Sequence, residues 1–346
     1  MLANNTQDNR YMEYAQTVLA ALQDKWYSSL WNGFIMNPWK LPNPWNAYNT
    51  LEALIDYTQI TTNKSYLSVI DDVAGSWGLL LRTKMAENDD AAWAGIALVK
   101  AYHLTKNENY LSKAKKAFSQ LINYWDEVCN GGVWWNLKRK YKNAITNELF
   151  LMLATMLYQE TEKRDYLEWA LKEWNWFKAS GLINNDHLIN DGLDSQCQNN
   201  GQTTWTYNQG VILGGLTNLW LLEGDSAYID KANQIANAVI NSTSLTYNGI
   251  LKEEMYRLNS DQEQFKGIFI RYLSYLASHE PKENEEEKQK FINFIGSNAN
   301  HVWDKARNNE NLINAYWVSD SGSTPHYDAI AQSSGLDLFN AAMRFV

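Results

Sequence analysis

The feature that most constrains the fold is an alternation between two kinds of helical segment along most of the chain. In the first kind, apolar residues recur at helical spacing along one side, as over residues 110–125 and 228–240. The second kind is apolar nearly all round, as over residues 91–99, 149–157 and 211–222. An amphipathic helix covers a core, whereas an all-round apolar helix lies inside one. The alternation therefore predicts inner helices surrounded by outer helices.

Periodicity predicts about a dozen helices and no convincing strand. The expected helices cover residues 8–30, 46–60, 65–81, 89–104, 109–128, 144–161, 164–180, 207–222, 226–241, 261–278, 285–303 and 329–345. The chain of 346 residues has no linker and no break in composition. It is therefore predicted to form a single domain, residues 1–346.

A weak internal repeat supports this arrangement. Short links join inner helices to the next outer helices, and each link ends in a tyrosine, at Tyr66, Tyr110, Tyr166 and Tyr228. The return loops are longer and hold clusters of Gly, Asn and Trp. About six helical hairpins of this kind predict an all-α fold, an (α/α)6 toroid, with the long loops around the starts of the inner helices.

Two adjacent acids, Asp89 and Asp90, open one of the inner helices. They form either a catalytic pair or the acidic first turn of a helix that Asn88 caps, since the helix dipole favours acids there. A second acid pair, Asp71 and Asp72, lies in an amphipathic stretch and is interpreted as a solvated face. What favours catalysis at Asp89 and Asp90 is that other inner helices also begin with polar residues. These are Asn143, Thr146 and Asn147, then Tyr207, Asn208 and Gln209, then Gln264 and Lys266, and last Gln332, Ser333 and Ser334.

Five motifs, in order along the chain, carry a resemblance to a known family. They are NDDAAW at 88–93, GGVWW at 131–135, KNAITN at 142–147, YNQG at 207–210 and KG at 266–267. Together they resemble glycoside hydrolase family 76, the endo-α-1,6-mannanases, from about Trp45 to the C-terminus. The resemblance implies an (α/α)6 barrel and retaining hydrolysis of α-1,6-linked mannose chains, in mannan or in manno-oligosaccharides. It also implies that Asp89 is the nucleophile and Asp90 the general acid/base.

Physical chemistry is compatible with these implied roles. A retaining pair needs carboxyl groups about 5–5.5 Å apart, a distance that neighbouring side chains at a helix start can span. The nucleophile must be ionised while the acid stays protonated, held so by its partner's charge and by partial burial. The helix N-terminus favours one ionised carboxylate. Which of the two is favoured does not follow from the sequence.

Several residues near these motifs are candidates for binding the sugar. Trp134 and Trp135 either stack on sugar rings or seal their loop onto the barrel. Amide side chains offer hydrogen bonds to hydroxyl groups, although a buried asparagine near a helix start is often a cap. Lys266 either reaches a polar group of the substrate or extends along the surface to solvent. The predicted substrate-binding residues are Trp134, Trp135, Asn147, Tyr207, Asn208, Gln209, Phe265 and Lys266.

Composition excludes several other classes of function. The net charge of −9 argues against nucleic acid and anionic membranes as partners. No cofactor and no metal site is expected, because the histidines follow no metal-binding pattern. Whether Asp186, Asp191 and Asp194 hold an ion stays open. Cys129 and Cys197 predict neither a disulfide framework nor a zinc site. The expected partner is a carbohydrate, and the protein is expected to be a monomer.

Location and alternative functions complete the predictions. Residues 1–8 have neither the basic nor the apolar region of a secretion signal, which predicts a cytoplasmic protein, or an extracellular one if a leader has been removed. A uronide hydrolase with the same barrel would need a basic pocket for its substrate. An epimerase of this type would need histidine bases, and no histidine starts an expected inner helix. The last alternative is a non-catalytic glycan-binding protein.

Overall fold

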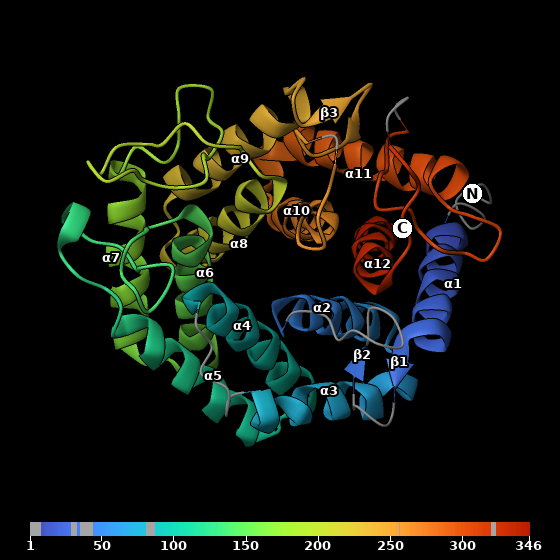
Figure 1. Cartoon of the computed structure of the whole chain (residues 1–346), viewed down its shortest axis with the longest axis horizontal. Coiled ribbons are helices and arrows are strands. Elements are labelled where there is room, and N and C mark those ends of the chain that lie inside the picture. Colours follow the sequence, from blue (N-terminus) through green and yellow to red (C-terminus); the bar gives the residue numbers. More distant parts are fainter. Residues whose placement is uncertain (1–7, 29–32, 35–43, 81–86, 256, 320–322) are drawn as a thin grey trace. The chain divides into compact units, whose positions relative to one another are not determined.

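The computed structural model describes residues 8–28, 33–34, 44–80, 87–255, 257–319 and 323–346. Twelve α-helices and four two-residue strands lie in these ranges (Figure 1). Their contacts divide the chain into two compact units, one of residues 77–239 and one of residues 1–76 with 240–346. Within the described ranges, no helix has both the length and the apolar character needed to cross a membrane.

The unit of residues 77–239 contains three consecutive hairpins of helices. Its helices are α4 (Asn88–Thr105), α5 (Glu108–Ile122), α6 (Ala144–Thr161), α7 (Arg164–Ala179), α8 (Thr206–Glu223) and most of α9 (Ser226–Asn241), with a short 3-10 helix η2 (Val128–Asn130). Helix α6 packs between α4 and α8, while α5 packs on α4 and α7 packs on α6. Figure 1 shows α5 and α7 on the outer side of α4 and α6.

The second unit is built around α12 (Ala329–Met343). Its other helices are α1 (Asp8–Trp26), α2 (Pro44–Thr61), most of α3 (Leu67–Leu80), α10 (Gln262–His279) and α11 (Glu285–Lys305), with short helices η1 (Lys64–Tyr66) and η3 (Lys282–Asn284). Two small hairpins, β1 (Tyr27–Ser28) with β2 (Gly33–Phe34) and β3 (Thr246–Tyr247) with β4 (Ile250–Leu251), follow α1 and α9. Helix α12 packs against α1, α2, α10 and α11.

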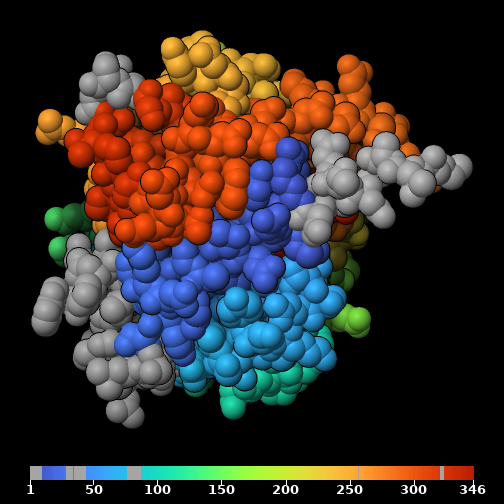
Figure 2. Space-filling view, turned by 90° about the vertical axis from the view of Figure 1, so that its right-hand side faces the viewer, coloured from blue at the N-terminus to red at the C-terminus, as the bar shows by residue number. Residues whose placement is uncertain are grey.

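Helix α1 covers one side of the second unit. In Figure 2 its blue surface lies against the orange and red surface of the C-terminal third of the chain. Tyr14 stacks on Trp303, with ring centroids 3.7 Å apart, and the Tyr11 hydroxyl donates to Asn300 Oδ1 at 3.2 Å. The N-terminal helix is therefore part of the packed core of this unit.

Burial confirms the two predicted kinds of helix. Helix α6 is buried at every residue from Ala144 to Leu157, and α12 is buried along its whole length. The amphipathic helices α5 and α7 instead bury one side each. The inner helices approach closely where glycine allows it: a Cβ on Gly267 of α10 would lie 2.6 Å from Ser334 Cα of α12.

The repeated short links are helix-ending devices. Thr105 at the end of α4 donates to Ala101 O at 2.8 Å and accepts from Asn107 N at 3.3 Å. The residue between them, Lys106, takes a left-handed backbone with φ of 58°. Thr61 and Thr161 make the same pair of hydrogen bonds at the ends of α2 and α6. The internal repeat seen in the sequence is therefore a repeated C-terminal cap.

The long loops are held by amide side chains from the inner helices that follow them. Asn147 accepts from Val133 N at 2.7 Å and donates to Val133 O at 3.1 Å. Gln209 makes the same pair of bonds with Ile189, both at 2.8 Å. Gln332 accepts from Ile313 N at 2.8 Å and donates to the carbonyls of Asn311 in the loop and Val18 in α1. We call Asn147, Gln209 and Gln332 the loop clamps.

Two of the predicted helices end earlier than expected. The first ends at Trp26 rather than near residue 30, because β1 starts at Tyr27. The fifth ends at Ile122 rather than near residue 128, and a 3-10 turn with left-handed Cys129 follows.

A disulfide joins Cys129 and Cys197, although the sequence predicted no disulfide framework for them. Their Cα atoms lie 5.2 Å apart although the residues are separated by 68 positions. Both have left-handed backbones, in the loops that follow α5 and α7. The sequence could not show that these loops meet, because spatial proximity depends on how α5, α6 and α7 pack.

A buried guanidinium joins three inner helices of the second unit. Arg271 of α10 donates to both carboxylate oxygens of Asp337 on α12, at 2.9 and 2.8 Å, and to Asn49 on α2. Its Nη1 also lies 3.3 Å from Glu52 Oε2. Burial raises the pKa of Asp337 to about 6, even though Arg271 opposes this shift. The three helices are therefore linked by one cation whose loss leaves buried carboxylates without their counter-ion.

Replacing Arg271 with methionine is expected to lower the free energy of unfolding by about 3–5 kcal/mol, the usual cost of removing one partner of a buried ion pair. The measurement is the fall in the urea midpoint at pH 7. The matched control is Arg164→Met, whose guanidinium faces an exposed glutamate on the same helix, Glu168. That substitution should cost at most about 1 kcal/mol. Equal losses in the two variants would contradict this assignment.

Candidate active site

The acid pair lies in the first turn of the inner helix α4. Asp89 and Asp90 follow Asn88, the first helical residue, and both side chains are partly exposed although the helix behind them is buried. Asp89 Oδ1 accepts a hydrogen bond from the backbone N–H of Asp90 at 3.1 Å. Two carboxyl groups are therefore held at the positive end of a buried helix, which favours negative charge.

Asn88 does not cap this helix, so the simple capping interpretation is wrong. The N-cap position belongs to Glu87, whose side chain makes no capping hydrogen bond. Asn88 is fully buried, donates from its amide to Trp134 O at 2.7 Å and accepts from Gln120 at 3.1 Å. Its backbone N–H donates to Trp135 O at 2.6 Å. Asn88 therefore joins the start of α4 to the loop that carries both tryptophans.

The two tryptophans of that loop have different surroundings. Trp135 is partly exposed, and its indole Nε1 donates to Asp89 Oδ2 at 3.0 Å. Trp134 is buried, donates to Asp126 Oδ2 at 2.7 Å and lies under the ammonium of Lys142 at 4.7 Å. Trp134 therefore seals the loop, whereas Trp135 contacts the acid pair directly.

The loop that carries these tryptophans is fixed from several sides. Lys142 is 2% exposed and its ammonium donates to the carbonyls of Val128 and Gly131, both at 2.6 Å. Gly132, with φ of 89°, packs on the Trp176 ring, and a Cβ there would approach the ring to 2.5 Å. The clamp Asn147 holds Val133. The position of Trp135 over Asp89 is thus set by a rigid loop.

The electrostatics of Asp89 combine opposing effects. Burial, and then the charge of Asp90, raise the pKa of Asp89 well above its ordinary value of 3.8. The hydrogen bonds from Trp135 and from backbone N–H groups act in the opposite direction, because they stabilise the ionised carboxylate. Burial and the Asp90 charge therefore favour the protonated form of Asp89, whereas its hydrogen bonds favour the ionised form.

Among the other predicted residues of this unit, two serve the loops. The side-chain amides of Asn147 and Gln209 are fully buried and form hydrogen bonds with backbone groups. Their part in substrate binding therefore stays a prediction. Tyr207 is partly exposed. Asn208 is fully buried, and neither its amide nitrogen nor its oxygen has a hydrogen-bond partner in the described part of the chain.

A third acid, Asp191, lies behind Trp135, and the sequence analysis named it only as a possible ion ligand. The backbone N–H of Trp135 donates to the backbone carbonyl of Tyr141 at 2.8 Å, and the rings of these two residues meet edge to face. The Tyr141 hydroxyl donates to Asp191 Oδ2 and accepts from Asn200 at 2.9 Å. Burial raises the pKa of Asp191, and the Tyr141 hydrogen bond opposes that rise. In the sequence, the only indication of this network was the aromatic and polar composition of the loops that precede α6 and α8.

Phe265 and Lys266 belong to the second unit and are described within it. The Phe265 ring lies 6.0 Å from that of Trp45. Lys266 is 1% exposed, so it does not extend to solvent, and its ammonium lies 5.6 Å from the Trp317 ring centroid. Burial lowers the pKa of Lys266, against the charges of Glu253 and Glu263.

One histidine lies closer to an inner helix start than the sequence indicated. His326 precedes Asp328, the N-cap of α12, by two residues, and its Nε2 lies 3.5 Å from Glu263 Oε1 at the start of α10. The helix prediction began at residue 329 and gave no reason to connect His326 with α10.

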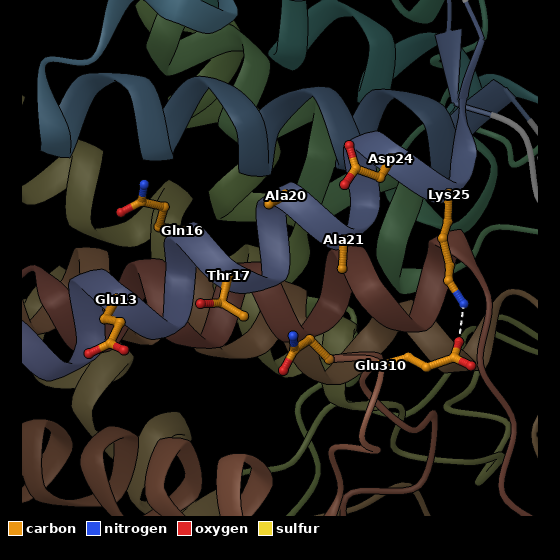
Figure 3. Close-up of a pocket in the computed structure, with 9 residues that line it drawn as sticks. Glu13, Gln16, Thr17, Ala20, Ala21, Asp24, Lys25 and Glu310 are labelled. Carbon is orange, nitrogen blue, oxygen red and sulfur yellow. Dashed lines mark hydrogen bonds and ion pairs between the residues drawn. The ribbon is translucent and has the colours of Figure 1, made fainter.

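A surface groove of about 530 Å³ runs along α1 in the second unit (Figure 3). Its walls carry small and charged side chains, and Lys25 is paired with Glu310 across it. None of the described residues that line the groove is aromatic, whereas a sugar-binding site commonly uses aromatic rings for stacking. It is therefore not the candidate active site.

Comparison with known proteins decides the family. The model for glycosyl hydrolase family 76 matches residues 10–345. The chain belongs to this family. Its curated relatives include the mannan endo-1,6-alpha-mannosidase DCW1 of Saccharomyces cerevisiae, 27% identical over 74% of this chain and 61% of the relative. A putative mannan endo-1,6-alpha-mannosidase of Schizosaccharomyces pombe is 27% identical over 56% of this chain and 48% of the relative. The chain thus spans about half to three fifths of the length of such relatives.

Solved family 76 structures share the fold along nearly the whole chain. The alpha-1,6-mannanase GH76A of Salegentibacter sp. HEL1_6, as an inactive variant with two adjacent aspartates replaced by asparagine, was solved with alpha-1,6-mannotriose. It has a TM-score of 0.87 and 26% identity, covering 96% of this chain and 99% of that one. Dfg5 from Chaetomium thermophilum, 20% identical with a TM-score of 0.81, shares the fold and covers 97% of this chain and 91% of its own. The predicted all-α class and (α/α)6 fold are confirmed.

Replacing Trp135 with phenylalanine is expected to raise the pKa of Asp89 further. The substitution removes an indole donor that stabilises the ionised carboxylate and keeps an aromatic ring in place. The measurement is a pH titration of the aspartate carboxyl carbons by NMR in protein labelled with ¹³C-aspartate, with Asp89 assigned from its asparagine variant.

The matched control for this titration is Trp134→Phe. That substitution removes an indole donor from Asp126 rather than from Asp89, so the pKa of Asp89 should stay where it is. An unchanged Asp89 titration in the Trp135 variant, or equal shifts in both variants, would contradict the assignment.

Proposed function

We propose that this protein hydrolyses α-1,6-linked mannose chains by a retaining double displacement, with Asp89 as nucleophile and Asp90 as general acid/base. The observation that carries the proposal is the pair of adjacent carboxyl groups at the start of α4, one of them bonded to Trp135. Relatives named mannan endo-1,6-alpha-mannosidases support the substrate class. The inactive mannanase variant that lacks two adjacent aspartates supports the roles of the pair.

In the first step, an oxygen of the Asp89 carboxylate attacks the anomeric carbon of a mannose residue. The bond to the glycosidic oxygen breaks, and Asp90 gives its proton to that oxygen, so the leaving chain departs as an alcohol. In the second step, Asp90 takes a proton from water as the water oxygen attacks the anomeric carbon. The ester to Asp89 breaks, and both acids return to their initial protonation states.

The hydrogen bonds at the pair support this division of roles. Asp89 accepts from the Trp135 indole and from the Asp90 N–H, and both bonds favour its ionised form. Each charge also raises the cost of ionising the neighbouring carboxyl group, so one proton is shared by the pair. The hydrogen bonds to Asp89 favour a proton on Asp90, as the proposed mechanism requires, and they act against the effect of burial on Asp89.

Three residues of the same unit are proposed to contact the sugar, one through its hydroxyl groups and two through its ring. Asn208 is the stronger candidate, because a fully buried amide without a hydrogen-bond partner is costly unless a ligand or water completes it. The partly exposed rings of Trp135 and Tyr207 offer surfaces for the sugar ring. Substrate binding stays a prediction for the remaining candidates, which are Trp134, Asn147, Gln209, Phe265 and Lys266. The monomeric state also stays a prediction.

Asp89→Asn and Asp90→Asn are each expected to lower kcat on linear α-1,6-manno-oligosaccharides, by about 10²–10⁴-fold for the acid/base variant and by more for the nucleophile variant. The amide cannot attack as an anion or give up a proton at neutral pH. The matched control is Asp71→Asn, which removes one exposed acid of the other adjacent pair and should keep full activity. A fully active variant at either position of the α4 pair contradicts the proposal.

The anomeric configuration of the first product tests the mechanism separately. ¹H NMR of the anomeric protons during early turnover should show the α-anomer before mutarotation. Initial β-anomer would keep the substrate and reject a nucleophilic Asp89. Absence of cleavage would reject the substrate class.

We further infer that the protein folds in an oxidising compartment, in place of the cytoplasmic location expected from its first residues. The supporting observation is the disulfide between Cys129 and Cys197, since such bridges persist mainly outside the cytosol. Alkylation of thiols during extraction from the source cells should leave both cysteines unmodified. Two alkylated thiols would contradict the inference.

Reducing this disulfide is expected to destabilise the protein by up to about 4 kcal/mol, the chain-entropy estimate for a loop of this length. The measurement is the fall in the urea midpoint on adding dithiothreitol. The sequence has two cysteines and both are in the bridge, so the Cys129→Ser/Cys197→Ser double variant is a clean control. Dithiothreitol should leave that variant unchanged, and an unchanged parent protein would contradict the estimate.

A further inference from the structure

Three side chains that can bind metal converge in the second unit, where α10 and α12 begin. Glu263 lies in the first turn of α10, and His326 and Asp328 directly precede α12. His326 Nε2 lies 3.5 Å from Glu263 Oε1 and 3.6 Å from Asp328 Oδ2. One ligand atom from each residue lies within 4.8 Å of the other two, an arrangement found nowhere else among the described His, Cys, Asp and Glu side chains.

The carboxylates of this cluster have oxygens left over after their structural contacts. Asp328 Oδ1 caps α12 by accepting from Ile330 N at 2.9 Å and Ala331 N at 2.8 Å. Asp328 Oδ2 and Glu263 Oε2 are buried and have no hydrogen-bond partner among the described residues. The two side chains are 6% and 5% exposed. Buried carboxylate oxygens without a partner are costly, which points to a missing positive ligand.

No neighbouring side chain supplies that positive charge in full. His326 is half-exposed, and its Nε2 lies 3.5 Å from Glu263 Oε1 and 3.6 Å from Asp328 Oδ2, longer than an ordinary hydrogen bond. The Lys266 ammonium forms no hydrogen bond within the described chain and faces the Trp317 ring. Two carboxylates are thus packed together with an excess of negative potential, which a divalent cation would neutralise.

We propose that Glu263, His326 and Asp328 bind a divalent transition-metal cation of the zinc type. One imidazole nitrogen and two carboxylate oxygens form a ligand set that zinc accepts, with bonds of about 2.0–2.2 Å. Bonds of that length place neighbouring tetrahedral ligands about 3.3 Å apart, close to the 3.5 and 3.6 Å found around His326 Nε2. Calcium takes six to eight oxygen ligands, which does not suit a site with an imidazole and two carboxylates.

The position of the site gives the metal an entry path and a structural role. The side chain of His326 is 53% exposed, so solvent reaches the cluster and a water molecule can complete the coordination. His326 also anchors its own segment, because its N–H donates to Asn314 Oδ1 at 3.1 Å and its C=O accepts from Ala315 N at 2.9 Å. A metal would cross-link this segment to α10. The proposal uses neither aspartate of the α4 pair and stands independently of mannan cleavage.

The test is zinc binding by protein that has been stripped with EDTA and dialysed. Isothermal titration calorimetry with ZnCl₂ at pH 7.5 should give one site per chain, and MgCl₂ should give none. His326→Ala and Glu263→Gln should each weaken the zinc Kd at least tenfold, because each removes one of three protein ligands. Zinc should raise the melting temperature of the parent protein but not that of the variants.

His103→Ala is the matched control for this experiment. His103 is a more exposed histidine that also contacts a glutamate, Glu160, but has no third ligand of this kind. Its variant should keep the parent Kd. Circular dichroism in EDTA should show that all three variants fold, which is expected for His326 because its side chain is half-exposed. The proposal is overturned if the parent protein lacks a stoichiometric site, or if His326→Ala binds zinc as tightly as the parent.

Discussion

A long loop that runs over the start of a buried helix has peptide groups that water cannot reach, and the fold depends on how those groups are satisfied. The clamps Asn147, Gln209 and Gln332 answer this constraint in the same way. Each side-chain amide accepts from the N–H of one loop residue, and two of them also donate to the C=O of that residue, as a neighbouring strand would. Small antiparallel bridges, such as Ile183 with Ile189, hold the same loops. An apolar residue at any of these clamp positions would leave buried peptide groups unpaired, at about 1–3 kcal/mol each.

The geometry of the acid pair follows from one of these clamps. Asn147 fixes Val133, and the chain then continues directly into Trp134 and Trp135. The buried Trp134 is anchored on Asp126, which leaves the next indole to reach Asp89. Asn88, the first residue of the helix that carries the acids, donates from its side-chain amide to the Trp134 carbonyl. It thereby links that helix to the loop. The geometry of the proposed catalytic pair is thus set by amide side chains that need not contact a substrate.

The sequence predicted most of the fold because the spacing of apolar residues distinguishes the two kinds of helix. Inner helices are buried on all sides, whereas outer helices are buried on one side. The sequence predicted less of the site, because a polar residue at an inner helix start has two possible causes. In the sequence, Asp89 and Gln209 are both polar residues that interrupt an apolar helix. In the structure, Asp89 is partly exposed, whereas Gln209 is buried and bonded to the backbone of the preceding loop. The pairing of Cys129 with Cys197 and the approach of His326 to Glu263 depend on contacts between distant segments. Such contacts leave no local pattern in the sequence.

The protonation of the acid pair shows how the environment distinguishes two chemically identical side chains. Burial by itself would keep Asp89 neutral, which is the opposite of what a nucleophile needs. The Trp135 indole and the Asp90 N–H act against this, and both are directed at Asp89 oxygens. When a sugar excludes water from the pair, these fixed donors become stronger because the local dielectric falls. Repulsion between two ionised carboxylates grows for the same reason, and the fixed donors favour ionisation of Asp89 against the effect of burial. In the proposed mechanism, substrate binding would therefore strengthen the donors that favour an ionised Asp89.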